Sequence, residues 1–413
     1  MHRFKYRGRK LYCEDVRVAD IARAVGTPAY IYSKNTLLDH YNKLKHALRE
    51  FSPLLCFSVK SNSNLAVLKT LVDVGAGLDI VSGGELYRAK LVKADPRKIV
   101  YAGVGKKQNE IIEAIRYGIL FFNVESQEEL ELINRCAKRL KKKVNVAIRI
   151  NPDVDVSTHK YITTGKAESK FGVDFKTAKN IFRSSWRYRS VDIKGVHLHI
   201  GSQILNLEPF EKAIRKTLRF LADNKIFIEY INIGGGLGIV YTFEKPQTAM
   251  GFAGRISSII RKSGLKLILE PGRFISGNSG IMVTKVLFRK KTGSRNFVIV
   301  DSGMNDLIRP SLYEAYHNIV PVTKPQKPSA RVKYDIVGPI CETGDFLAKD
   351  RKLGRIKRGD LLAVMGAGAY GYAMSSNYNS RPRAVEVMVS GNRFFIGRKR
   401  ETYRDLVRGE TTR

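Results

Sequence analysis

The stretch LLCFSVKSNSNLAVLKTLVDVGAGLDIV, residues 54–81, predicts a strand, a helix and a second strand in succession. Residues 54–59 and 78–81 are short, apolar runs, whereas residues 64–74 have the length and spacing of a helix. The alternation continues from about Ala29 to Glu270, with further strands predicted at 29–32, 99–102, 121–124, 144–150, 191–200, 227–233 and 266–270. Repeated β-α units over roughly 240 residues favour a closed (β/α)8 TIM-like barrel, although an open doubly wound sheet has the same local pattern.

The pattern of residue types changes after Arg273, where short β-rich runs are separated by Gly and Pro turns. This pattern predicts a C-terminal, mainly antiparallel β domain. Near the N-terminus, residues 4–6 and 10–13 resemble a hairpin, and a leading strand needs a sheet to pair with. We therefore predict leading strands in 1–28 that join the C-terminal β domain, a cofactor-binding barrel over 29–273 and the β domain over 274–413.

Composition supports a two-domain globular protein, because 413 residues exceed one hydrophobic core and 43% of them are hydrophobic. We expect neither secretion nor a membrane span, since no apolar run reaches about 18 residues. The four cysteines lie far apart without CxxC spacing, which argues against a zinc site or a disulfide scaffold. This cysteine usage fits a cytoplasmic protein in a reducing compartment.

The formal net charge of +35 raises the question of nucleic acid. The basic residues come in short groups, such as Lys141–Lys143 and Arg398–Arg400, that are mixed with acids over the whole length. This dispersal favours a solvated basic surface over a specific nucleic-acid site. Non-specific attraction to polyanions that weakens with salt is the expected side effect.

Polar residues just past the strands are the candidates for chemistry, because a barrel collects its active site at the carboxyl ends of its strands. Lys60 follows one strand, where a partly desolvated amine can react with an aldehyde; a solvated lysine is the alternative. His197 and His199 share one face of another strand, and two histidines alone make a metal site improbable, so we predict none. An imidazole can instead lie flat against an aromatic cofactor, with Ser202 free to bond an anion.

Two turns add to this set. Residues 233–238, IGGGLG, follow a strand, and their glycines let backbone amides approach a phosphate, although a plain tight turn is the alternative. Glu270 ends an apolar strand, where a carboxylate can keep a ring nitrogen protonated, and a salt bridge with Arg273 is the alternative.

The segment GPICETGD, residues 338–345, places one thiol beside carboxylates. Cys341 is either a buried apolar thiol or a proton donor, since a thiol is largely protonated at neutral pH yet gives up its proton readily.

Together these pieces resemble the fold-type III pyridoxal-phosphate decarboxylases, in particular the diaminopimelate decarboxylase family, over nearly the whole chain. The resemblance rests on motifs whose order and spacing also agree: residues 57–64, 78–85, 151–155, 197–203, 234–238, 270–273, 341–345 and 368–371.

The resemblance implies a pyridoxal 5'-phosphate cofactor that is bonded covalently to Lys60, stacked against His199 and held at its ring nitrogen by Glu270. The cofactor-binding positions that it implies are Lys60, Asp79, His199, Ser202, Gly236, Glu270, Pro271, Gly272, Arg273 and Tyr370. The substrate-binding positions are Arg273, Arg309, Tyr313, Glu342 and Tyr370, and Cys341 matches the acid that protonates the carbanionic carbon.

The implied reaction converts meso-diaminopimelate to L-lysine, the last step of lysine biosynthesis, in a homodimer whose partner chain supplies Cys341 and Glu342. Glu342 favours this substrate over that of ornithine-type relatives, which have Asp at this position. The alternatives are decarboxylation of ornithine, arginine or carboxynorspermidine, or a non-catalytic regulatory relative. The chain departs from the family at Ser58 and Ser61, where alanine is usual.

Overall fold

The computed structural model describes residues 2–155, 170–327 and 330–412. The chain forms two compact units. One unit comprises His40–Ile239 and Lys245–Phe274, and the other comprises Met1–Asp39, Val240–Glu244 and Ile275–Arg413. No helix within the described residues has the length and apolar character that crossing a membrane requires.

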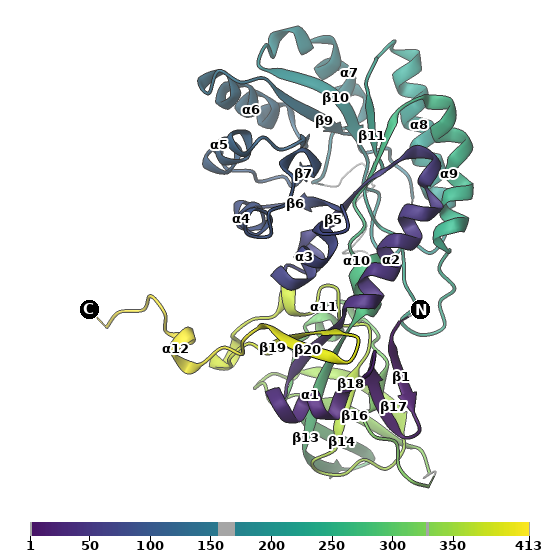
Figure 1. Cartoon of the computed structure of the whole chain (residues 1–413), viewed down its shortest axis with the longest axis vertical. Coiled ribbons are helices and arrows are strands. Elements are labelled where there is room, and N and C mark those ends of the chain that lie inside the picture. The colour runs from purple at the N-terminus through teal and green to yellow at the C-terminus, as the bar shows by residue number, and fades with distance from the viewer. Residues whose placement is uncertain (1, 156–169, 328–329, 413) are drawn as a thin grey trace. The chain divides into compact units, whose positions relative to one another are not determined.

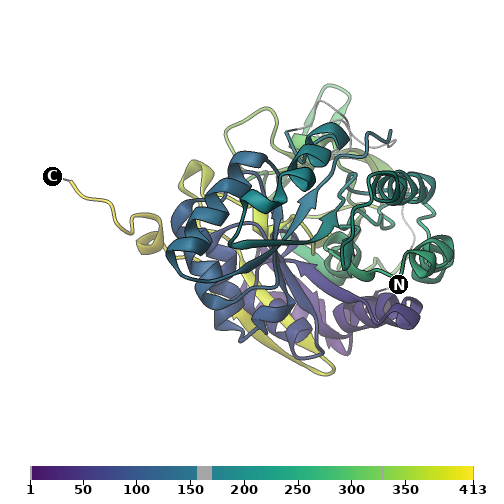
Figure 2. The ribbon, with the colours of Figure 1, turned by 90° about the horizontal axis from the view of Figure 1, so that it is seen from above.

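The first unit contains a closed barrel of eight parallel strands, as predicted (Figure 1). The strands close in the order β10-β11-β12-β5-β6-β7-β8-β9. Their bounds are β5 Leu54–Ser58, β6 Gly77–Ile80, β7 Ile99–Tyr101, β8 Phe121–Val124, β9 Val144–Arg149, β10 Val191–His197, β11 Tyr230–Asn232 and β12 Lys266–Leu269. Figure 2 shows the helices of this unit around the outside of its strands.

Several of the helices that alternate with these strands begin at polar caps whose side chains accept a hydrogen bond from the first turn. Asn64, Ser82 and Ser126 accept hydrogen bonds at the starts of α3, α4 and α6. The bounds are α2 Lys34–Ala47, α3 Leu65–Val72, α4 Gly83–Leu91, α5 Gln108–Tyr117, α6 Gln127–Arg139, α7 Phe175–Arg183, α8 Glu208–Asp223 and α9 Ala249–Ser263.

The barrel interior changes from apolar to polar along the strands. Its apolar cluster contains Cys56, Val100, Phe121 and Ile268. Two residues further along a strand, side chains lie on the same face again. Ser58, Asn123 and Glu270 therefore follow Cys56, Phe121 and Ile268 towards the carboxyl end, where the predicted site residues also lie.

The register of the barrel aligns polar residues from neighbouring strands. Ser58 of β5 is paired with Asp79 of β6. His197 of β10 is paired with Asn232 of β11 on one side and with Arg149 of β9 on the other. These pairings align two polar residues on β5 and β6 and three on β9, β10 and β11.

The second unit is built on a nine-stranded sheet. Its path is β17-β16-β14-β13-β4-β19-β20, and β18 pairs with β13 and β15. All pairs are antiparallel except β14–β16 and β4–β19, so the predicted, mainly antiparallel β architecture is confirmed. The bounds are β4 Ala29–Ser33, β13 Gly280–Thr292, β14 Arg295–Val300, β15 Ile319–Pro321, β16 Val332–Val337, β17 Phe346–Leu353, β18 Leu361–Val364, β19 Val385–Ser390 and β20 Arg393–Arg398, with short helices α10 Arg273–Ser276, α11 Arg309–Tyr313 and α12 Tyr403–Leu406.

The assignment of residues 29–32 to the barrel was wrong. Ala29–Ser33 forms β4, which pairs with β13 and β19 in the nine-stranded sheet. All five residues are buried. A fully buried apolar strand has the same local pattern in either sheet, so its sequence does not reveal its partners.

The leading residues form a separate three-stranded sheet of β1 Phe4–Arg7, β2 Lys10–Cys13 and β3 Val16–Arg17, followed by helix α1 Val18–Val25. Phe4 and Leu11 belong to the same core cluster as Ile281 and Val387. The Leu11 amide also donates to the Val322 carbonyl oxygen at 2.9 Å. The leading strands are thus packed onto the β unit without extending its large sheet.

Candidate active site

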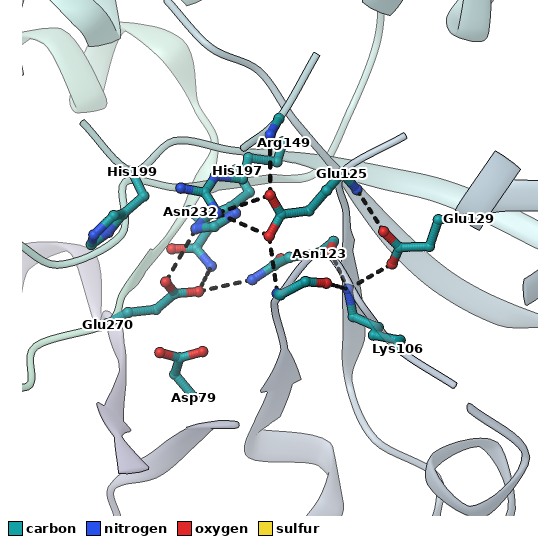
Figure 3. A network of polar contacts seen from close by, with 12 residues as sticks. Asp79, Lys106, Asn123, Glu125, Glu129, Arg149, His197, His199, Asn232 and Glu270 are labelled. Carbon is teal, nitrogen blue, oxygen red and sulfur yellow. Dashed lines mark hydrogen bonds and ion pairs between the residues drawn. The ribbon is translucent and has the colours of Figure 1, made fainter. Parts of the chain in front are cut away.

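Glu270 is the centre of a buried polar cluster at the carboxyl ends of the barrel strands (Figure 3). Its Oε1 atom accepts hydrogen bonds from the side-chain amides of Asn123 at 2.8 Å and Asn232 at 2.6 Å. Its Oε2 atom lies 3.1 Å from Nε2 of His197. The carboxylate of Glu270 is therefore fixed by side chains from three different strands.

These contacts keep Glu270 ionised. Burial by itself raises the pKa of the Glu270 carboxyl, but the charge and hydrogen bond of His197, together with Lys60, outweigh it and hold the pKa well below its usual range. A buried carboxylate that stays charged is the partner that a protonated ring nitrogen requires. Arg273, the alternative partner considered from sequence, donates to Ser202 instead, with Nη2 3.0 Å from Oγ.

Lys60 and Asp79 form an ion pair in the same unit. Lys60 lies in the short 3-10 turn Val59–Ser61 after β5, and its Nζ is 3.4 Å from Oδ2 of Asp79. The Ser58 hydroxyl donates to the same oxygen at 2.6 Å. Burial, and then the charge of Glu270, raise the pKa of Asp79 to about 6, although Lys60 and Ser58 oppose the shift.

His199 is a neutral imidazole in this environment. Burial, followed by the charges of Lys60 and Arg149, lowers its pKa well below the usual value. Its Nδ1 atom accepts a hydrogen bond from the Gly235 amide at 3.2 Å. This bond ties His199 to the glycine loop, and a neutral ring suits stacking on a flat cofactor without adding charge.

The glycine loop Gly234–Gly236 lies directly against neighbouring backbone. A Cβ atom on Gly235 would be 2.2 Å from the Glu270 carbonyl oxygen, and one on Gly236 would be 2.4 Å from that of Gly201. Gly236 also has a φ of +105°, which side chains rarely adopt. Only glycine allows the loops after β10, β11 and β12 to pack this closely.

The residues present fit pyridoxal phosphate. A lysine amine, an ionised carboxylate and a neutral imidazole supply partners for its aldehyde, its ring nitrogen and its ring face. The glycine loop and the Ser202–Arg273 pair supply small residues, a hydroxyl and a cation of the kind that binds phosphate.

A second buried network lies beside this cluster (Figure 3). Arg149 Nη1 contacts both carboxylate oxygens of Glu125, at 2.9 and 3.0 Å. Lys106 is fully buried and lies 2.6 Å from Glu129, whose carboxylate also accepts from the Glu125 amide. Burial tends to raise the pKa of Glu125, but Arg149 and Lys106 lower it overall, so this pair is charged in the interior.

Four residues of these networks were not predicted from the sequence: Asn123, Asn232, Glu125 and Arg149. Each lies within or directly after a buried apolar strand, as in Phe121-Phe122-Asn123-Val124. A polar residue inside such a run is the signal that points to them, because a buried polar side chain needs a partner.

The remaining candidates lie in the β unit. Arg309, at the start of α11, is buried, and its Nε lies 3.3 Å from Nε2 of His317. Cys341 and Glu342 occupy an exposed loop. The Ser311 hydroxyl of α11 donates to the Gly344 carbonyl oxygen at 2.6 Å, so this unit brings Arg309–Tyr313 and the loop together.

The loop that carries Cys341 is held by hydrogen bonds on both sides. The Asp345 carboxylate accepts from the amides of Met304 and Ile340, each at 2.7 Å. The Cys341 amide donates to Oδ1 of Asn379 at 2.8 Å. The thiol is therefore exposed on a well-anchored turn, and the alternative of a buried apolar cysteine is wrong.

Tyr370 has a backbone conformation that is unusual for its residue type. Its φ is +56°, between buried Ala369 and Gly371. A non-glycine residue in this region stores backbone strain, and such residues concentrate at functional sites.

The pyridoxal-binding domain model of the pyridoxal-dependent decarboxylases matches residues 34–277. A diaminopimelate decarboxylase from Aquifex aeolicus is 48% identical over 98% of this chain and 96% of its own length. The diaminopimelate decarboxylase of Helicobacter pylori, solved with L-lysine, has a TM-score of 0.90 at 39% identity, covering 94% of this chain and 98% of that one. The corresponding M. jannaschii complex with L-lysine has a TM-score of 0.94 at 36% identity, covering 99% and 98%.

These similarities span both units and confirm the family, the cofactor and the class of reaction that the motifs predicted. The chain belongs to the diaminopimelate decarboxylase family of pyridoxal-phosphate-dependent enzymes.

Proposed function

We propose that this enzyme removes CO2 from meso-2,6-diaminopimelate to give L-lysine, the last step of lysine biosynthesis. The observation that carries the proposal is the Glu270 cluster: a carboxylate held ionised by three strands, in the unit that also presents Lys60 and His199. Full-length relatives with this activity support the choice of substrate.

The cofactor would be held along the carboxyl ends of the barrel strands. Lys60 would bond it covalently, His199 would lie on its ring, and Glu270 would face its ring nitrogen. Its phosphate would be bound by Ser202, Gly236, the backbone of residues 270–273 and Tyr370, and Asp79 would contact Lys60. When bound, pyridoxal phosphate delocalises the electron pair that departing CO2 leaves behind.

The chain's own residues maintain the conditions for that chemistry. Glu270 keeps a proton on the nitrogen that it faces, because its own pKa is far too low to take that proton. His199 stays neutral and so adds no positive charge that would compete with the ring. Burial of Asn123, Asn232 and His197 excludes water from the Glu270 carboxylate.

Substrate selection would rest on charge at the distal end of the amino acid. Diaminopimelate carries a second ammonium and a second carboxylate there, which a carboxylate and arginines can bind together. We assign Glu342 to the ammonium and Arg273 and Arg309 to carboxylates, with Tyr313 and Tyr370 as further contacts.

A panel of amino acids tests this assignment. CO2 release should be fast with meso-diaminopimelate and at least about a hundredfold slower with ornithine or arginine, because these lack the distal carboxylate that the arginines bind. Turnover of ornithine without turnover of diaminopimelate would exclude the proposed substrate.

Cys341 is proposed to protonate the carbon that has lost CO2. The thiol is exposed on its anchored turn, as expected for a group that serves the active site of a second copy of the chain. We therefore propose a homodimer with two active sites, each completed by Cys341 and Glu342 of the other chain.

Mixing inactive subunits tests the shared site. Lys60→Ala and Cys341→Ala chains should each be nearly inactive, whereas their mixture should recover activity, because one site of each heterodimer has both native residues. Random exchange places half of the chains in heterodimers, so about a quarter of the sites become native. No recovery after confirmed exchange would contradict the shared site.

Borohydride reduction and peptide mapping test the enzymatic assignment itself. The cofactor should be found on the peptide that contains Lys60, and its absence there would favour a non-catalytic relative. We further propose that the two units act as the barrel and β domains of the enzyme, and that it works in the cytoplasm, where its four free cysteines stay reduced.

A further inference from the structure

Ser58 is one of the two serines that stand where the family resemblance implies alanine, and it lies beside Lys60 and Asp79. Its side chain is almost fully buried, and its hydroxyl lies 2.6 Å from Oδ2 of Asp79. The second departure, Ser61, is equally buried, but its hydroxyl donates to the Ser58 carbonyl oxygen at 2.8 Å. Only one of these two serines is thus bonded to the carboxylate that faces Lys60.

The ionised form of the Asp79 side chain depends strongly on the hydrogen bond from Ser58. Its side chain is completely buried, and its Oδ1 atom is buried without a hydrogen-bond partner among the described residues. The hydrogen bonds from Ser58 and Lys60 both reach the other oxygen, Oδ2. A buried carboxylate with so few donors is costly to keep ionised, and each remaining donor carries a large share of the stabilisation.

We propose that Ser58 is a positioning residue whose hydroxyl keeps Asp79 as a carboxylate beside Lys60, and that Ser58 thereby extends the Lys60–Asp79 ion pair to lower pH. The inference rests on the proposed function for the role of Lys60. When Ser58 donates, Asp79 keeps its negative charge and stays paired with Lys60. Without the hydroxyl, Asp79 accepts a proton at a higher pH, and its ion pair with Lys60 is lost there.

Several other charged groups act on the same pair. Glu270 raises the pKa of Asp79, and His197 lowers it. Glu85, whose pKa burial raises to about 7, interacts with both Asp79 and Lys60. Lys60 also acts on His199. Replacing Ser58 by alanine leaves all of these groups in place, so the substitution isolates the hydroxyl.

The test is the titration of Asp79 in the full-length chain after removal of the cofactor. Carbon-13 NMR of labelled aspartate carboxyl groups over a range of pH, with the Asp79 signal identified by its loss in Asp79→Asn, gives the midpoint at which Asp79 loses its proton. Ser58→Ala should shift this midpoint by about one pH unit towards alkali, as expected for loss of a hydrogen bond to a charged group. Ser61→Ala is the matched control and should leave the midpoint unchanged.

A double mutant shows whether the effect passes through Asp79. The loss of stability in Ser58→Ala should be greater at pH 8 than at pH 4 in the native background, and independent of pH in the Asp79→Asn background. Rebinding of pyridoxal phosphate by each variant verifies that the site is folded.

An unchanged Asp79 midpoint in Ser58→Ala, or a stability loss whose pH dependence persists in the Asp79→Asn background, would overturn the inference. The CO2 assay on the unaltered chain tests the proposed function separately, because that function can fail while the Asp79 midpoint still responds to Ser58.

Discussion

Replacing Gly235 by alanine should weaken cofactor binding, because the loop at Gly235 has no room for a methyl group. The added Cβ would lie 2.2 Å from the Glu270 carbonyl oxygen and 3.1 Å from its carbonyl carbon. Ordinary contact begins at 3.4 Å, so the two backbones must separate by about 1.2 Å, the difference between 3.4 and 2.2 Å. That movement also stretches the hydrogen bond between the Glu270 amide and the Gly234 carbonyl oxygen, now 2.8 Å long.

The magnitude follows from these two effects. Overpacking of this kind costs about 1–3 kcal/mol, and a lost backbone hydrogen bond adds about 1 kcal/mol. The loop relaxes in the free protein and must be drawn back to bind phosphate, so the cost divides between stability and affinity. If half of the total appears in binding, the Kd for pyridoxal phosphate rises about five- to thirtyfold.

Absorbance titration of the stripped protein with pyridoxal phosphate measures the affinity, and urea unfolding measures the stability. Gly254→Ala is the matched control, because a Cβ on Gly254 in α9 would have no atom within 4 Å. This control should bind normally and gain up to about 1 kcal/mol of stability from helix propensity. Wild-type affinity and wild-type stability together in Gly235→Ala would refute the argument that the loop requires glycine.

Three further predictions concern the buried charges. Glu270→Gln should retain pyridoxal phosphate but lower kcat at least about a hundredfold, because a neutral amide cannot hold a proton on the ring nitrogen. The absorbance of bound cofactor measures retention and steady-state kinetics measure kcat. An unchanged kcat would contradict the role of Glu270. The pKa of the Asp79 carboxyl is raised from 3.8 to about 6. The native chain therefore has its full stability below pH 4, where Asp79 is protonated, and loses part of it as the pH rises through 6 and the buried group ionises. Asp79→Asn should therefore gain roughly 3 kcal/mol over the native chain at pH 8 and nothing near pH 4, as unfolding at both pH values would show, and a gain independent of pH would exclude this cause. Arg149→Ala should lower the free energy of unfolding by about 3–5 kcal/mol, because it leaves Glu125 buried without its cation. Arg261→Ala breaks the exposed pair with Glu50 and should lower the free energy of unfolding far less; equal losses would mean that burial does not decide the effect.

Local pattern was sufficient for much of the fold. All eight barrel strands overlap runs that were predicted as strands, because short apolar segments between helices have a recognisable length and composition. The same rule produced the one misplaced strand, β4, whose five buried residues suit a barrel or a sheet equally well. In the β unit, β15, β17 and β20 were not predicted. β20 has no buried residue and β17 has only two, so both carry a weak apolar pattern.

Some of the active-site residues could also be predicted from local pattern, whereas others depend on contacts between strands. Lys60 and Glu270 are recognisable in the sequence because each directly follows an apolar strand, and parallel strands bring their carboxyl ends to one face. Ser58 appeared in the sequence only as a departure from a family pattern. Its hydrogen bond to Asp79 depends on the register of β5 against β6.

The sequence by itself determined the order of the barrel's strands and helices, the family and the candidate residues for binding its cofactor, because those features depend on local composition and spacing. The tertiary structure alone decided what surrounds Glu270. Asn123 is 147 residues from Glu270 along the chain and His197 is 73 residues from it, and neither distance predicts a contact. Closure of the barrel and the register of its strands bring these side chains together, and their burial and hydrogen bonds then fix which carboxylate stays charged.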